Sequence, residues 1–109
     1  TTGKVRRQFC RTLGKSHSIA DGTLLPEADP GNYQLIEKLV ETLIAVKDDD
    51  IRKAIVATLQ TGKLLIEPSA AMGIAAAMAG DLPVKPEEKV CFVISGGNCD
   101  MHMLAELLK

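Results

Sequence analysis

The apolar run at residues 89–94 constrains the fold more than any other feature of the sequence. This run (KVCFVI) is followed at once by a glycine turn, residues 95–98 (SGGN). An unbroken apolar run of this length is typical of a strand buried on both faces. Residues 100–108 then carry leucines at helical spacing. A strand, a glycine turn and a helix in this order predict an α/β fold, in which ligands bind at the carboxyl end of the strand.

Three segments upstream of this unit have apolar residues at helical spacing. The first begins at Asn32, which we expect to cap it. The second follows the acids of residues 48–50, which suit the positive end of a helix dipole. The third begins at Pro68 and is rich in alanine, with Gly73 in its middle, so another backbone should pack closely against it. Residues 42–46 form a short apolar run of strand length.

Composition excludes several classes of function. The 109 residues form one domain or a piece of one, and the 46% hydrophobic and 25% charged residues suit a chain that buries a core. A net charge of −1 and the absence of Trp argue against a nucleic-acid partner. The longest apolar stretch, residues 72–79, is far shorter than the roughly 20 residues that a membrane span needs.

The N-terminal segment differs in charge from the rest of the chain. Residues 1–17 contain five basic residues and no acid. A solvated segment explains this charge, and a nucleic-acid arm is the alternative. The three cysteines are odd in number and irregular in spacing, which predicts a reducing compartment and a cytoplasmic protein rather than a disulfide framework. His17 and His102 have no partner at ligand spacing, so no metal site is expected.

Two positions are candidates for chemistry on the residues alone. Ser95 would place its hydroxyl at the end of the predicted strand, beside a turn whose backbone can approach a ligand. The alternative is a tight turn in which Asn98 or Asp100 caps the next helix. Glu67 ends an apolar run before Pro68, where a partly buried carboxylate could carry a proton. The alternative for Glu67 is a carboxylate that only faces a helix dipole.

Three short motifs occur in a familiar order. Residues 18–22 (SIADG), 63–69 (KLLIEPS) and 94–98 (ISGGN) together resemble the C-terminal part of serine/threonine dehydratases and serine racemases. These are pyridoxal-phosphate enzymes of the tryptophan-synthase-β fold, called fold type II. The resemblance covers about residues 16–109 and implies the C-terminal portion of a doubly wound, mainly parallel-sheet domain. Residues 1–15, the basic N-terminal segment, match poorly.

The resemblance implies roles for five residues. Ser95 would hydrogen-bond the pyridine nitrogen of pyridoxal 5'-phosphate, and Gly96 of the same motif would belong to the cofactor-binding set. Gly22 would lie against one face of the cofactor ring. Glu67 would lie near the ring, fix its electrostatics and take part in catalysis. In the racemase branch, Lys63 would belong to a nucleotide effector site.

The resemblance also implies an activity and the parts that it needs. The expected reaction converts L-threonine or L-serine to a 2-oxo acid and ammonia, with serine racemisation as the alternative. None of the nine lysines stands in the family's Schiff-base motif, so residues 1–109 alone should be inactive. The expected partners are the remainder of the enzyme chain and further copies of the intact enzyme. A non-catalytic α/β fragment that binds an anion or mediates dimerisation is a second alternative.

Overall fold

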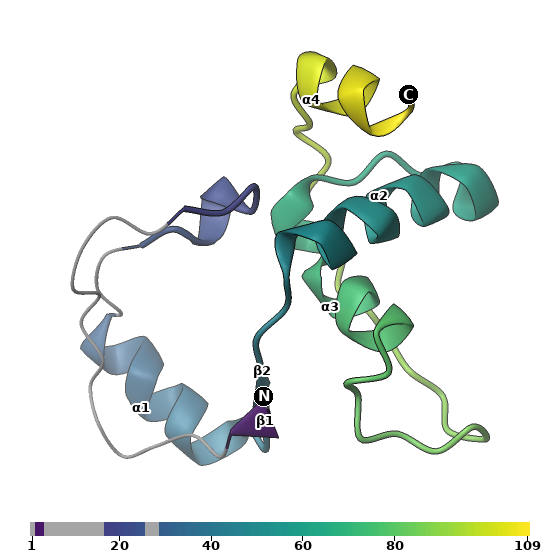
Figure 1. Cartoon of the computed structure of the whole chain (residues 1–109). Helices are drawn as coiled ribbons and strands as arrows, with labels where there is room; N and C mark the ends of the chain where they lie inside the picture. Colours follow the sequence, from purple (N-terminus) through teal and green to yellow (C-terminus); the bar gives the residue numbers. More distant parts are fainter. Residues whose placement is uncertain (1, 4–16, 26–28) are drawn as a thin grey trace.

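Two packed helices form the centre of the computed structural model, which describes residues 2–3, 17–25 and 29–109 (Figure 1). They are α2 (Asp48–Gly62) and α3 (Pro68–Met78). The three aspartates of residues 48–50 occupy the first turn of α2, where negative side chains face the positive end of the helix dipole. Pro68 begins α3, where its missing N–H costs no hydrogen bond. Both predicted helices are confirmed.

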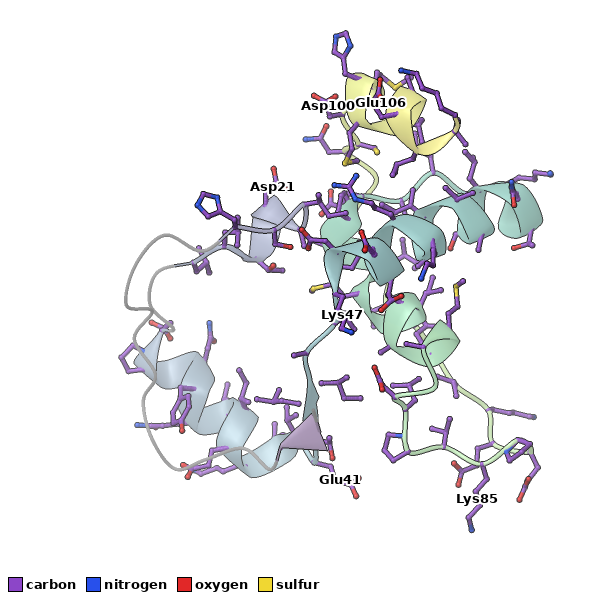
Figure 2. The ribbon with its side chains drawn as sticks, viewed as in Figure 1. Asp21, Glu41, Lys47, Lys85, Asp100 and Glu106 are labelled. Carbon is purple, nitrogen blue, oxygen red and sulfur yellow. The ribbon has the colours of Figure 1, made fainter. Side chains whose placement is uncertain are left out.

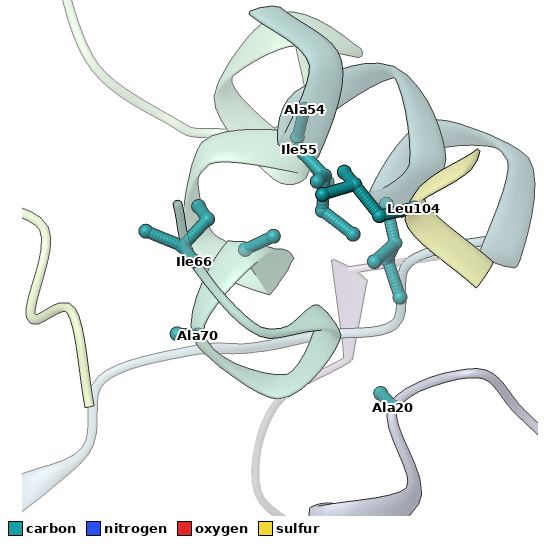
Figure 3. Close-up of a cluster of buried hydrophobic side chains, with 9 residues drawn as sticks. Ala20, Ala54, Ile55, Ile66, Ala70 and Leu104 are labelled. Carbon is teal, nitrogen blue, oxygen red and sulfur yellow. The ribbon is translucent and has the colours of Figure 1, made fainter. Parts of the chain in front are cut away.

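The core lies between these two helices, and alanine makes up much of it (Figure 3). Such small side chains let the two backbones approach closely, as the alanine-rich sequence predicts. Gly73 does not serve this interface, because it is exposed and a Cβ there would lie 3.2 Å from Cδ1 of Phe92. The buried core residues are Ala20, Ile51, Ala54, Ile55, Ile66, Ala70, Ala71, Ala75 and Leu104.

Helix α1 (Pro30–Leu39) begins two residues earlier than predicted. Asp29, not Asn32, caps it: Asp29 Oδ1 accepts a hydrogen bond from the backbone N of Asn32 at 2.9 Å. Proline at the first helical position suits this start, because its φ is already helical. No residue of α1 is buried, and Figure 1 shows the helix apart from the α2–α3 pair.

The remaining elements are short. Strand β1 (Thr2–Gly3) pairs antiparallel with β2 (Leu43–Ile44), which lies within the predicted strand-length run. A 3-10 turn, η1 (Asp21–Thr23), contains the Asp-Gly pair of the first motif. Helix α4 (Met101–Leu107) ends the described fold. None of the described helices is long and apolar enough to cross a bilayer.

The predicted strand at residues 89–94 is wrong. These residues form no strand in the structure, and the side chain of Val93 is 83% exposed rather than buried. A β-strand needs a hydrogen-bonded neighbour along its length. Among the described residues, the β1–β2 pair is the one sheet, so nothing supplies a ladder to residues 89–94. The apolar pattern of residues 89–94 indicates a tendency to be buried. It does not show whether neighbouring strands are present to pair with the segment.

These exposed apolar side chains lead to a prediction about residues 1–109 as an isolated polypeptide. Val93, Leu39 and Leu25 are each more than two-thirds exposed, and such surfaces drive association. We expect the isolated polypeptide to elute as oligomers in size-exclusion chromatography. Val93→Lys should reduce the association more than Arg52→Lys, a control that preserves charge. A monomer with a sharp, cooperative thermal transition would contradict this expectation.

Candidate functional site

The three sequence motifs meet at the N-terminal end of α3. The backbone N of Glu67 donates to the carbonyl O of Gly96 at 3.1 Å, which joins the second motif to the third. Gly22 of the first motif lies against Ser69, so closely that a Cβ on Gly22 would be 2.9 Å from Ser69 Oγ. Residues separated by more than 70 positions therefore lie in one place.

Glu67 occupies the N-cap position of α3 but does not cap the helix with its side chain. Its Oε2 instead accepts a hydrogen bond from the backbone N of Asn98 at 3.2 Å. The carboxylate also covers Gly96, where a Cβ would lie 2.5 Å from Oε2. The side chain is half-buried between the helix start and the glycine turn. A helix dipole alone does not account for this arrangement, because the carboxylate is turned toward the third motif.

The glycine turn is shaped by the protein's own packing. A Cβ on Gly97 would lie 2.9 Å from the carbonyl O of Leu65, a backbone atom that cannot easily move. The backbone N of Cys99 donates to Gly97 O at 2.9 Å and closes the turn. Ser95, by contrast, is exposed and makes no hydrogen bond with the described residues. Its hydroxyl is therefore available to donate to, or accept from, an external group.

Asp100, rather than Asn98, caps the next helix. Its Oδ1 accepts from the backbone N of His102 at 2.7 Å and of Met103 at 2.9 Å. These bonds hold the pKa of the Asp100 carboxyl below its usual value. Partial burial raises the pKa of the Cys99 thiol, and the charges of Asp100 and Glu67 raise it further. Two carboxylates and a neutral thiol thus lie beside the glycine turn.

A cavity of about 290 Å³ opens beside these residues. Its walls come from the first motif, the start of α3, the glycine turn and α4. Figure 2 labels the two carboxylates among its lining residues, Asp21 at η1 and Asp100 at the start of α4. The lining residues are Ile19, Asp21, Pro68, Asn98, Asp100 and Met103.

Among the described residues, no hydrogen bond or ion pair joins the Lys63 side chain to this group. Lys63 ends α2 in the left-handed conformation, with φ of 55°. Its Nζ donates to the carbonyl O of Gln60 at 2.7 Å, so the ammonium group supplies a hydrogen-bond donor to a carbonyl group in the last turn of α2. The nucleotide effector role of Lys63 stays a prediction.

Sequence reasoning missed two residues that organise the site. Ser69 packs on Gly22, and its Oγ is buried without a hydrogen-bond partner among the described residues. Asp48 accepts hydrogen bonds from Ser18 Oγ and from the backbone N of Ile19. The available signal was weak, because Asp48 is one of three consecutive aspartates that all suit the start of a helix.

Comparison with known proteins gives consistent matches. A family model described as pyridoxal-phosphate dependent enzyme matches residues 3–96. The chain is 34% identical over 104 residues to an L-threonine ammonia-lyase of Thermotoga maritima, covering 95% of this chain and 25% of the relative. It is 34% identical over 100 residues to the serine racemase of Homo sapiens, covering 90% and 29% respectively. The chain thus spans less than a third of the length of these relatives.

Solved structures agree with these matches. The serine racemase from Dictyostelium discoideum aligns with a TM-score of 0.71 at 34% identity, over 81% of this chain and 29% of that chain. A threonine deaminase from T.th. aligns with a TM-score of 0.76 at 20% identity, over 84% and 32%, and shows the fold alone. These likenesses confirm the predicted fold class, fold type II, although residues 89–94 form no strand here.

The tight packing of the glycine turn gives a stability prediction. Gly97→Ala would place a methyl group 2.9 Å from Leu65 O, and we expect it to cost about 1–3 kcal/mol of unfolding free energy. Gly62→Ala is the control, because the nearest atom to its Cβ would be 3.9 Å away. Urea unfolding of the full-length protein measures both variants. Equal midpoints for the two variants would show that the turn has room for a side chain.

Proposed function

The chain belongs to the family of pyridoxal-phosphate-dependent enzymes, and we propose that it forms one wall of the cofactor site of an L-threonine or L-serine ammonia-lyase. The reaction converts the amino acid to a 2-oxo acid and ammonia. The observation that carries the proposal is the meeting of Gly22, Glu67 and Gly96 in one place. The 34% identity to an L-threonine ammonia-lyase supports the substrate class.

The cavity is of a size to take the ring of pyridoxal phosphate, and Ser95 and Gly22 lie outside its lining but on the segments that contribute Asn98 and Asp21 to it. The volume of about 290 Å³ is near the lower limit for small-molecule pockets, about 300 Å³. Ser95 offers a neutral hydroxyl that no described residue engages, as a ring nitrogen requires. Gly22 is exposed apart from its contact with Ser69, so a flat ring can approach its backbone. When bound, the cofactor supplies an electron sink for the α-carbon of the amino acid.

The side chains of this chain have separate tasks in the proposal. Ser95 hydrogen-bonds the ring nitrogen without protonating it, because a hydroxyl is a far weaker acid than a carboxyl group. Glu67 keeps a carboxylate beside the ring, and the Asn98 N–H and the surface of Gly96 fix its position. Gly22 leaves one ring face uncovered by any side chain.

The proposal includes parts that residues 1–109 do not supply. None of the nine lysines stands in the family's Schiff-base motif, so we expect this segment alone to be inactive and to need the remainder of the enzyme. Assembly of the intact enzyme into a homo-oligomer and a cytoplasmic location belong to the same proposal. The free thiols of Cys91 and Cys99 support a reducing compartment.

Serine racemisation is the second candidate function. The relatives at 34% identity include serine racemases of Rattus norvegicus and Homo sapiens, so sequence identity does not separate the two activities. Incubation of the full-length protein with L-serine distinguishes them. Pyruvate and ammonia indicate elimination, whereas D-serine indicates racemisation.

The role of Ser95 leads to a binding prediction. Ser95→Ala leaves the ring nitrogen without its partner, and we expect the affinity for pyridoxal phosphate to fall roughly 5- to 150-fold. Spectroscopic titration of the full-length protein measures this affinity, at equal folded fraction. Thr61→Ala removes another exposed hydroxyl, on α2, and serves as the control. Unchanged affinity in Ser95→Ala would show that Ser95 is only a turn residue.

The role of Glu67 leads to a kinetic prediction. Glu67→Gln preserves the shape of the side chain but removes its charge, so turnover should fall while the fold stays intact. Glu87→Gln makes the same charge change at an exposed loop position and should leave turnover unchanged. If Glu67 only faced the helix dipole, its substitution would cost about 0.3–1 kcal/mol of stability and little activity. That result in steady-state assays and thermal unfolding would remove Glu67 from the site.

A further inference from the structure

We propose that Asp48 is a positioning residue for the cofactor site, because its carboxylate fastens the loop that carries Gly22 to the start of α2. The inference rests on the proposed function, which places the cofactor beside Gly22. Both oxygens of Asp48 are engaged: Oδ1 accepts from Ser18 Oγ at 2.6 Å, and Oδ2 accepts from the backbone N of Ile19 at 3.1 Å. Paired hydrogen bonds to one carboxylate fix orientation as well as distance.

The fastening continues through the loop to Gly22. Ser18 Oγ also accepts from the backbone N of Ala20 at 3.1 Å. The side chain of Ala20 is buried in the core, and its carbonyl O accepts from Thr23 Oγ1 at 2.7 Å and from Thr23 N at 3.0 Å. These bonds close η1 around Gly22. An unbroken series of contacts therefore joins the Asp48 carboxylate to the glycine.

The neighbouring aspartates do not share this role. Asp50 pairs with Lys53 of its own helix at 3.0 Å, and Asp49 is exposed. All three lie in the first turn of α2, so the helix dipole favours each of them alike. Within the described residues, Asp48 is the one of the three aspartates that has hydrogen-bond partners in the loop, and these partners precede it by 30 and 29 residues. Asp49 is thus a matched control in charge, helix position and residue type.

The position of this loop affects the candidate site because Gly22 packs tightly against α3, which leaves the loop little room to shift. Gly22 lies so close to Ser69 that a Cβ would be 2.9 Å from its Oγ. The loop also supplies Ile19 and Asp21 to the wall of the cavity. Binding sites need such walls held by supporting hydrogen bonds, since small displacements weaken ligand contacts. Release of the loop from Asp48 would therefore change the cavity without removing any cavity residue.

The test compares Asp48→Asn with Asp49→Asn in the full-length protein. The amide side chain keeps the shape of aspartate but replaces one accepting oxygen with a donor. In the cofactor-free protein, hydrogen-exchange protection of the Ile19 amide should fall about tenfold in Asp48→Asn and stay unchanged in Asp49→Asn. Affinity for pyridoxal phosphate should fall about tenfold in the same variant alone, at equal thermal midpoints. Ser18→Ala, which removes one of the two donors, should weaken both readouts in the same direction.

The outcomes separate this inference from the proposed function. A parent protein that does not bind pyridoxal phosphate overturns the proposed function. Equal affinity for the cofactor in Asp48→Asn and Asp49→Asn, with the parent binding normally, overturns the inference alone. Reduced protection at Ile19 with unchanged affinity also overturns it, because Asp48 would then hold the loop without positioning the site. If Asp48→Asn does not fold, Ser18→Ala decides by the same two measurements.

Discussion

Packing between the alanine surfaces of α2 and α3 determines where everything else in this chain lies. Ala54 of α2 and Ala71 and Ala75 of α3 are completely buried. Alanine loses no rotamer entropy on burial and lets two helix backbones approach closely. Because the starts of both helices contact the same short loop, through Asp48 and Ser69, they must lie close together. The candidate site occupies this end of the helix pair.

Hydrogen bonds and glycine contacts then refine the position of each site residue. Glu67 is the N-cap residue of α3, and its backbone N and its carboxylate both bind the glycine turn. Gly97 is needed for the protein's own packing, since a Cβ there would lie 2.9 Å from the backbone Leu65 O, whereas a Cβ at Gly96 would displace the Glu67 carboxylate. Contacts within the protein thus set the shape of the turn that a ligand would approach. Ser95, at the edge of the turn, makes no hydrogen bond with the described residues.

The sequence predicted those parts of the structure that depend on short-range pattern. Helices α2 and α3 follow from apolar spacing and from residues suited to helix starts, and the order of the three motifs led to Gly22 and Glu67. The prediction of a strand at residues 89–94 was wrong because an apolar run shows only a tendency to be buried. A strand also requires a neighbouring strand with which to form hydrogen bonds. The role of Asp48 was not predicted because its hydrogen-bond partners lie 29 and 30 residues away in the sequence. No local pattern distinguishes it from Asp49.

The exposed apolar segments and the candidate site share the same backbone contacts. Leu64 and Leu65 precede Glu67, Val93 and Ile94 precede the glycine turn, and all four side chains are exposed. The bond between Glu67 N and Gly96 O holds the ends of these two segments together. Under the proposed function, any part of the enzyme that covers the segments must therefore lie beside Glu67. Burial of apolar surface would then provide the free energy that brings the remaining catalytic groups, the Schiff-base lysine among them, to the cavity.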